Sequence, residues 1–349
     1  MSDFLQLHLL TAYGPSNLNR DDTGRPKSVV FGGVPRIRVS SQSLKRAWRQ
    51  SAVFKEQLDG HLAARTRRLG ADVLERLRAG GMDEDRSLEV AREIAGVFGK
   101  LTSEKEDTQA SIQQLAFISP EEKARALELA DRALAGEEIE PTPDGLLQRA
   151  DSAADVAMFG RMFAEDPKFN REAAVQVAHA ITTHRAIAED DYYTAVDDLK
   201  SRDEPDDAGA GFVGVQEFGA GLFYLYVCVD RGLLLNNLGG DRAVRDASLA
   251  ALVEAATTVS PRGKQASFAS RACATYVLAE KGTAQPRSLV AAFLRPVGST
   301  DQGRHSIEAL ERFRKRLDDA YGVRADSRCT MDVEAESGTL SDVISFAVS

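Results

Sequence analysis

The chain has 349 residues, with 44 lysines and arginines against 53 aspartates and glutamates, and its formal net charge is -9. With 43% hydrophobic and 28% charged residues, the composition is typical of a globular protein of about two domains and excludes disordered and collagen-like chains. Taken alone, the negative charge argues against a nucleic-acid partner.

The longest apolar runs, such as residues 222–229, are far shorter than the roughly 20 residues of a membrane-spanning helix. The first residues lack the pattern of a secretory signal, so we expect a cytoplasmic protein with no membrane partner. Cys228, Cys273 and Cys329 are scattered and form no C-x-x-C pair. We expect reduced, mostly buried thiols, no metal site and no cofactor.

The first part of the chain predicts two strands and a helix. Residues 4–10 predict a strand, and the stretch 14–33, rich in Gly, Pro and Asn, predicts a long loop. Residues 34–40 predict a second strand because Ile37 and Val39 alternate with polar residues. Ser40 or Ser41 is a suitable N-cap for the helix that follows.

From residue 53 to about 171, Ala, Leu, Glu and Arg dominate with helical spacing, which predicts a helical insertion. Residues 173–183 and 222–229 predict strands, and the segment between them predicts a hairpin-like protrusion over 188–218.

The C-terminal part predicts a helix over 242–258, strands over 274–279 and 289–294, and a helix over 307–320. Strands separated by helices, with a helical insertion and a later protrusion, predict an α+β core that carries two appendages.

Positive charge is concentrated in residues 17–50, whose net charge is +6, whereas the remaining 315 residues carry 36 basic and 51 acidic side chains. The polar face of the predicted helix is formed by Gln42, Lys45, Arg46 and Arg49, at i, i+3, i+4 and i+7. The opposite face is formed by Leu44, Ala47 and Trp48. This pattern predicts an amphipathic helix whose basic face is exposed.

Other basic and polar residues of this region join the helix face. They are Arg36, Arg38 and Ser40, on one face of the preceding strand, and Arg20 and Lys27, in the loop. Together they predict a groove for a phosphate backbone. A merely solvated helix face is the alternative.

The protrusion is acidic, with nine acids against Lys200 and Arg202 over residues 186–207. Its apolar residues are Tyr192, Tyr193, Thr194 and Val196 on one side of the turn and Phe212 and Val213 on the other. The hairpin could tuck these side chains onto its own body, or its aromatic tip could wedge between bases. The residues alone leave both interpretations open.

Two enzymatic interpretations remain. His179 or His184, beside the predicted phosphate groove, could serve a metal-independent endoribonuclease. Gly209, Gly211 and Gly214 match G-x-G-x-x-G, but an acidic segment precedes them and strand-like residues follow, so a dinucleotide site is disfavoured.

Several motifs resemble one protein family. They are NLNRDD (17–22), FGG (31–33), SSQSLKRAWR (40–49), GRM (160–162), AHAITTH (178–184), YYTAVDDL (192–199) and QEFGAGLFYLY (216–226). Together they resemble the CasC family, the backbone subunit of the type I-E CRISPR surveillance complex called Cascade. The likeness covers the first 55 residues and 160–230.

This resemblance implies a ferredoxin-like, RNA-recognition-motif-like palm with helical fingers and a β-hairpin thumb. The implied parts are palm (1–55), fingers (56–172), palm strand (173–187), thumb (188–218) and palm (219–349). It also implies a non-catalytic subunit that polymerises along CRISPR RNA, together with further copies of itself and other Cascade subunits, so that the guide can pair with target DNA in antiviral defence.

The resemblance also assigns roles to residues. Guide phosphates would be held by Arg20, Lys27, Ser40, Gln42, Lys45, Arg46 and Arg49. Bases would be displaced by Met162, Tyr193, Thr194 and Val213, with Tyr192 and Val196 beside them. The chain departs from the family pattern in having Tyr192-Tyr193 where Trp-Phe is usual, and in the acidic insert Asp203 to Asp207.

Overall fold

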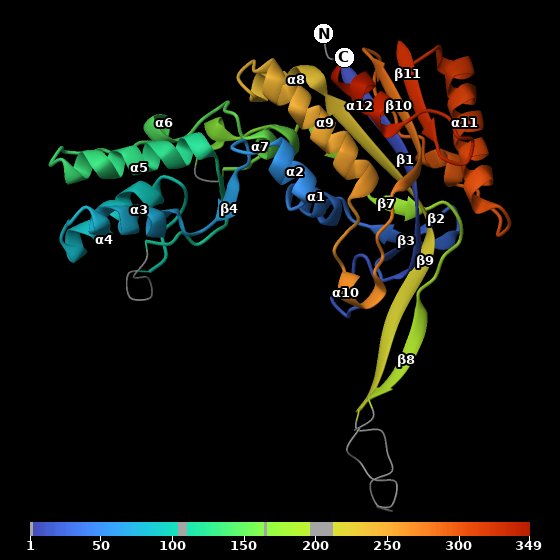
Figure 1. Cartoon of the computed structure of the whole chain (residues 1–349), viewed down its shortest axis with the longest axis horizontal. Coiled ribbons are helices and arrows are strands. Elements are labelled where there is room, and N and C mark those ends of the chain that lie inside the picture. Colours follow the sequence, from blue (N-terminus) through green and yellow to red (C-terminus); the bar gives the residue numbers. More distant parts are fainter. Residues whose placement is uncertain (1–2, 104–109, 164–165, 196–211) are drawn as a thin grey trace, which may run out of the picture.

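The computed structural model describes residues 3–103, 110–163, 166–195 and 212–349. Val196, Gly209, Gly211 and the acidic insert Asp203 to Asp207 lie outside the described residues. Figure 1 shows a body with a helical arm on one side and a hairpin that projects from its lower end.

The body is built on an antiparallel sheet of nine strands among the described residues, in the order β11-β10-β1-β9-β7-β3-β2, with β6 and β8 also paired to β9. The first four strands in this order are β11 (Ser327–Asp332), at the edge, β10 (Ala274–Gly282), β1 (Phe4–Ser16) and β9 (Phe212–Asp230). The shorter strands are β2 (Ser28–Phe31), β3 (Val34–Val39), β6 (Val175–Val177), β7 (Ala180–Thr182) and β8 (Glu189–Ala195).

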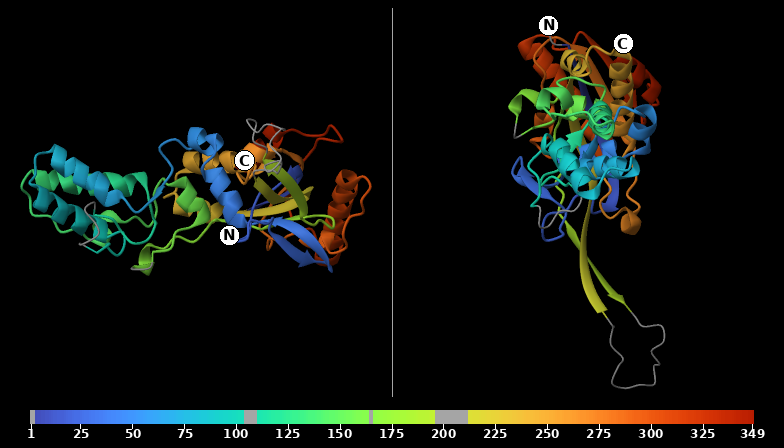
Figure 2. Two further views of the ribbon diagram at one scale, coloured as in Figure 1. Left: turned by 90° about the horizontal axis from the view of Figure 1, so that it is seen from below. Right: turned by 90° about the vertical axis from the view of Figure 1, so that its left-hand side faces the viewer.

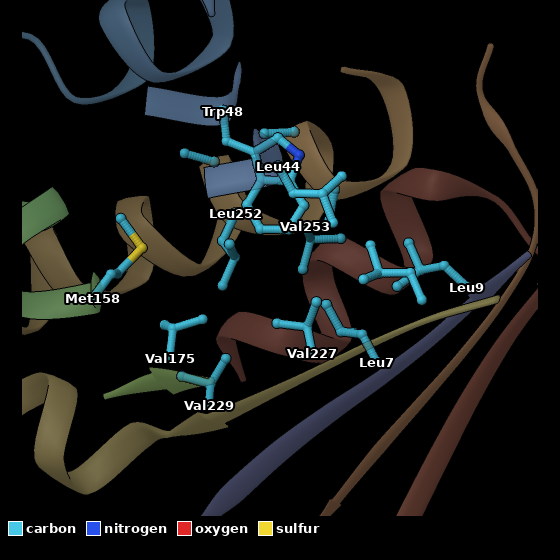
Figure 3. Packing of buried hydrophobic residues seen from close by; sticks show 14 of the residues in the cluster. Leu7, Leu9, Leu44, Trp48, Met158, Val175, Val227, Val229, Leu252 and Val253 are labelled. Carbon is cyan, nitrogen blue, oxygen red and sulfur yellow. The ribbon is translucent and has the colours of Figure 1, made fainter. Parts of the chain in front are cut away.

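Helices cover both faces of this sheet. One face is covered by α1 (Ser41–Arg49), α2 (Ala52–Gln57), α7 (Ala154–Phe159), α8 (Arg231–Asn237), α9 (Arg242–Thr258) and α12 (Leu340–Val348). Leu7 and Leu9 of β1 and Val227 of β9 pack there beneath Trp48 (Figure 3). The other face is covered by α11 (Gln302–Tyr321) and the 3₁₀ turn η2 (Val290–Phe293). Because strand side chains alternate, β1 is buried on both faces.

The face under α11 holds a buried polar network around His8 and Glu280, which are both 0% exposed. His8 contacts the Tyr224 hydroxyl at 2.9 Å through Nδ1 and Glu280 at 3.3 Å through Nε2. Burial lowers the pKa of His8, and this effect exceeds the opposing influence of Glu280. Although burial opposes it, hydrogen bonds from His8, Arg287 and Arg328 hold the pKa of Glu280 well below its usual range.

This arrangement predicts that stability falls as pH falls. Below about pH 6.5 the unfolded chain protonates His8 while the folded chain does not, so the unfolded state binds more protons. We expect that the free energy of unfolding of His8→Gln depends less steeply on pH, by up to about 1.4 kcal/mol per pH unit. Urea unfolding of both proteins between about pH 7 and pH 5 measures it. Equal slopes in the two proteins would contradict the assignment.

The arm has a hydrophobic core of its own. It is formed by α3 (Leu69–Ala79), α4 (Glu84–Gly96), α5 (Pro120–Leu134) and α6 (Pro143–Leu146), with the two-stranded sheet of β4 (Ala64–Thr66) and β5 (Ala116–Ile118) and the 3₁₀ turn η1 (Pro167–Phe169). Ser119 and Glu122 form a capping box at the start of α5. Because α2 and α7 belong to the core of the body, this second core lies inside the predicted insertion 56–172 and is shorter than it.

The projecting hairpin consists of β8 and the first part of β9, paired from Glu189 with Phe218 to Ala195 with Phe212. The rest of β9 continues into the body sheet, where it pairs with β1. The right view of Figure 2 shows the hairpin projecting from the body. The hairpin is therefore anchored by a strand that is itself part of the core.

Most predicted elements are confirmed, including the helix over 242–258, whose bounds are those of α9. Two predictions are wrong. The stretch 14–33 is not one loop, because it contains the end of β1 and the whole of β2. The expected strand over 289–294 is absent, and η2 (Val290–Phe293) is a 3₁₀ turn in its place. The expectation of mostly buried thiols is also wrong, because only Cys228 of the three cysteines is buried, while Cys329 is half-buried and Cys273 is exposed. In the part of the chain that the structure describes, no helix could cross a membrane.

Candidate nucleic-acid interface

The segment between β1 and β2 is folded against the base of the hairpin. Asn17 donates its side-chain amide to the carbonyl oxygens of Gly24 and Glu217, at 3.0 and 2.9 Å. Asp21 accepts hydrogen bonds from Thr23 and from the backbone of Arg25, and the bond from Thr23 lowers the pKa of Asp21. These bonds fix a turn whose first residue, Arg20, is exposed.

Helix α1 is amphipathic, as predicted. Its N-cap is Ser40, whose hydroxyl accepts the N–H of Ser43, and its buried residues are Leu44, Ala47 and Trp48. Gln42 and Arg46 are exposed. Lys45 lies 5.8 Å from the centroid of the Phe159 ring, and burial lowers its pKa.

A hollow of about 760 Å³ separates the turn, α1 and the segment before α10 (Gln265–Phe268). Its cationic lining consists of Arg20, Arg46 and Arg262, beside Asp21 and Asp22. A second hollow of about 230 Å³ shares Arg20 and Gly24 with the first and extends to Lys264 and to Tyr193 on the hairpin. We call the two hollows together the basic groove. It joins α1 to the hairpin base.

Arg262 and Lys264 were not predicted. Arg262 donates to the carbonyl oxygen of Gln50 at 2.9 Å, and Lys264 contacts the side chain of Gln216 at 3.4 Å. Gly263 allows this approach, because a Cβ at this position would lie 2.3 Å from the carbonyl oxygen of Leu18. The signal for this loop in the sequence was Pro261 followed by two cations on either side of Gly263, shortly after the predicted helix 242–258.

Arg36 is wrongly predicted as a phosphate ligand. Its residue is 0% exposed, beneath η2. The guanidinium donates to the carbonyl oxygens of Phe31, Thr182 and Phe293 at 3.2, 2.9 and 2.8 Å. The polar face of β3 is therefore partly interior, and Arg36 ties three segments together.

Two further predicted ligands are engaged inside the protein. Ser40 is buried, and its hydroxyl caps α1. Arg49 donates Nε to Asp155 at 2.7 Å and lies 4.4 Å from the centroid of the Phe117 ring. Because the Asp155 side chain is 1% exposed, Arg49 neutralises a buried carboxylate, while its own side chain is 19% exposed.

Arg38 lies on the face of β3 opposite Ile37 and Val39 and hence away from α1. Lys27, directly before β2, accepts the backbone N–H of Arg38 at 2.8 Å. Arg38 contacts Nδ1 of His179 at 3.1 Å. Burial, followed by the charges of Arg38 and Lys27, lowers the pKa of His179. The structure therefore divides the predicted phosphate ligands between two surfaces.

The two histidines of the enzymatic interpretation differ. His184 is buried, its Nε2 accepts the N–H of Leu222 at 3.2 Å, and its Nδ1 contacts the carbonyl oxygen of Arg185 at 2.8 Å. Both ring nitrogens are thus occupied, and burial lowers the pKa of His184. His179 is exposed. No group of three His, Cys, Asp or Glu residues suited to a metal ion occurs within the described ranges.

Met162 is 84% exposed at the base of the arm. Its neighbours Arg161 and Phe163 are buried, and Arg161 forms an ion pair with Glu122 at 2.7 Å. The chain thereby holds an apolar side chain in solvent between two fixed residues.

The hairpin exposes aromatic side chains on both faces. Tyr192 is 64% and Tyr193 is 46% exposed, and adjacent strand residues point to opposite faces. Tyr192 pairs with Val215, and Thr194 pairs with Val213. Tyr193 lies over Gly214, where a Cβ would come within 2.5 Å of its ring. Tyr193 also lines the basic groove.

Comparison with protein families gives a match over residues 5–346 to the model described as CT1975-like protein. The chain belongs to this family. It is also similar along 99% of its length to a chain of a "CRISPR RNA-guided surveillance complex, pre-nicking", with 29% identity, a TM-score of 0.83 and all of that chain covered.

A second chain, of a "CRISPR RNA-guided surveillance complex", matches over 99% of both chains with 27% identity and a TM-score of 0.73. No curated protein matches. The CT1975-like fold described above is therefore shared from end to end with components of such complexes, arm and hairpin included.

Proposed function

We propose that this chain is the backbone subunit of a type I-E Cascade complex. In this proposal it binds CRISPR RNA in the basic groove, assembles with further copies of itself and with other Cascade subunits, and presents the guide to target DNA. The body would be the ferredoxin-like palm, the arm the fingers and the hairpin the thumb.

One observation carries the proposal: the basic groove runs from α1 to the hairpin, in a fold that matches two surveillance-complex chains over 99% of its length. Arg20 and Arg46 form no ion pair with a residue in the described ranges, so their charges are available to an anion. Contacts to phosphates are independent of sequence, as a protein that serves many guides requires.

The hairpin supports a further part of this proposal, in which the thumb displaces bases of the bound strand. Tyr193 lines the groove and Tyr192 faces the other way, so a strand that follows the groove meets an aromatic ring at its end. Aromatic rings stack on any base, which permits displacement without a sequence preference. The guide then supplies the specificity by pairing with its target.

We further propose that the subunit performs no catalytic step. The occupied ring nitrogens of His184 support this, since a general base needs a nitrogen within reach of its substrate. The alternative is an endoribonuclease that uses the exposed His179, which lies beside Arg38. A variant of His179 tests this alternative.

The test is to incubate the purified chain with labelled CRISPR RNA and to follow assembly by light scattering and RNA length by electrophoresis. We expect particles that grow with guide length while the RNA stays intact. Cleavage that disappears in His179→Ala would favour the enzyme, and a failure to bind CRISPR RNA would refute the proposed function.

A further inference from the structure

The segment between α9 and β10 contacts both the basic groove and the projecting hairpin. We call residues 260–272 the α9–β10 loop. Arg262 lines the first hollow of the groove, and Lys264 lines the second. Four residues after Lys264, Phe268 contacts Phe218 of β9, with the ring centroids 6.2 Å apart. One short segment therefore joins the cations of the groove to the strand that carries the hairpin.

The hairpin leaves the body sheet at the junction of Phe218 and Gly219. The pairing of β9 with β1 ends where Ser16 pairs with Gly219, and its pairing with β8 begins where Glu189 pairs with Phe218. Beyond this junction the hairpin consists of two strands in the part of the chain that the structure describes. Two strands alone are only weakly stabilised. The direction of the hairpin relative to the groove therefore depends on the contacts at this junction.

The polar contacts at the junction constrain the hairpin only in part. Ser16 donates its hydroxyl to the carbonyl oxygen of Gly219 at 3.3 Å. Arg25 forms an ion pair with Glu217, but the Arg25 side chain is 61% exposed. Exposed ion pairs contribute little to stability, because water screens them and the long side chains lose entropy. The ring of Phe268 is the apolar support at this junction.

The α9–β10 loop has a fixed conformation. The side-chain amide of Gln265 donates to the carbonyl oxygens of Pro261 and Ser270, at 2.8 and 3.0 Å. Lys264 and Ala269, on either side of α10, have left-handed backbone with φ values of 51° and 48°. Residues other than glycine rarely adopt this conformation, and it persists only where the surrounding structure holds it. A loop held in this way can position the side chains that it contacts.

The loop is also fixed against the wall of the groove. Gly263 lies against the backbone of Asn17 and Leu18, where a Cβ would come within 2.6 and 2.3 Å of their carbonyl oxygens. Arg262 donates to the carbonyl oxygen of Gln50 at the end of α1. The distance between the groove cations and the hairpin is therefore set by the packing of the loop before any strand binds.

We propose that the α9–β10 loop positions the hairpin over the basic groove, and that Phe268, acting through Phe218, sets the angle at which Tyr193 meets a base of the bound strand. Phe268 lines neither hollow, so it is a positioning residue. Tyr193 pairs with Gly214, four residues from Phe218 along β9, so a rotation at the junction moves its ring relative to the groove. The inference rests on the proposed function, because it concerns how the hairpin displaces a base.

The experiment assembles the full chain on CRISPR RNA, adds a complementary DNA strand and maps its thymines with permanganate, which oxidises thymines that are not stacked in a duplex. Thymines opposite a displaced guide base should react. We expect Phe268→Ala to lower this reactivity by about threefold or more, because an aromatic pair shifts an equilibrium by about two- to tenfold. RNA affinity, measured by fluorescence anisotropy, should change by less than about twofold, because the cations of the groove are retained. Phe268→Tyr keeps the ring and should restore the reactivity.

The matched control is Phe346→Ala, which removes a half-buried ring from α12, at the end of the body opposite the hairpin (Figure 1). It should change neither quantity. Unchanged thymine reactivity in Phe268→Ala overturns the positioning role, and so does a loss of reactivity that merely follows a loss of RNA affinity. In both cases the proposed function stands if the unaltered chain gives reactive thymines. An unaltered chain that binds the guide without any reactive thymine would refute base displacement itself, and with it this inference.

Discussion

The double variant Arg20→Ala with Arg46→Ala should bind CRISPR RNA at least about 100-fold more weakly than the unaltered chain. Both side chains are exposed, line the basic groove and form no ion pair within the described part of the chain. A charge-assisted hydrogen bond contributes about 1.5–3 kcal/mol, and each 1.4 kcal/mol corresponds to about tenfold in affinity. Fluorescence anisotropy over a range of salt concentrations should also show a slope lower by about 1.4.

The matched control is Arg312→Ala with Arg316→Ala, which removes two exposed arginines from α11 on the opposite face of the sheet. It changes the net charge by the same amount, so it separates groove contacts from general electrostatic attraction. If both double variants weakened RNA binding equally, the result would contradict the proposal that the basic groove binds the guide.

Arg36→Ala should lower the free energy of unfolding by at least about 3 kcal/mol. The substitution leaves the carbonyl oxygens of Phe31, Thr182 and Phe293 without the donor that Arg36 provides. Each buried acceptor left unsatisfied costs about 1–3 kcal/mol. This is a large share of the roughly 5–15 kcal/mol that stabilises a typical protein. Urea unfolding followed by circular dichroism measures it.

Arg38→Ala is the comparison, because Arg38 lies two residues away on the same face of β3 and is partly exposed. We expect it to change stability by less than about 1 kcal/mol. An Arg36→Ala protein as stable as the unaltered chain but deficient in RNA binding would show that Arg36 is available to phosphate after all.

Arg36 and Arg46 were both predicted to bind phosphates, but only Arg46 is exposed. Their contrast shows which structural features the sequence could predict. On α1 the period of the helix correctly predicted the buried residues Leu44, Ala47 and Trp48 and the exposed residues Gln42 and Arg46, because one face had to pack on α9 and the sheet. On β3 the same reasoning placed Arg36 outside. Alternation tells which residues share a face, but here η2, from a segment more than 250 residues away, covers part of that face.

The side of the basic groove formed by Arg262 and Lys264 could likewise not be predicted from local patterns in the sequence. Arg262 and Lys264 are far from residues 17–50 in sequence and reach them because Gly263 packs against Leu18. Similarly, Arg49 fits the basic stripe of α1, yet the buried carboxylate of Asp155 holds it. Local patterns therefore predicted the elements and the charged region, whereas partners brought in by the tertiary fold decided which cations are available.

The most direct test of the central claim is an electron cryomicroscopy reconstruction of the chain assembled on CRISPR RNA. The account predicts guide phosphates within hydrogen-bonding distance of Arg20 and Arg46, about 3 Å, and a base displaced beside Tyr193. A guide that runs along another surface and leaves the basic groove empty would contradict it.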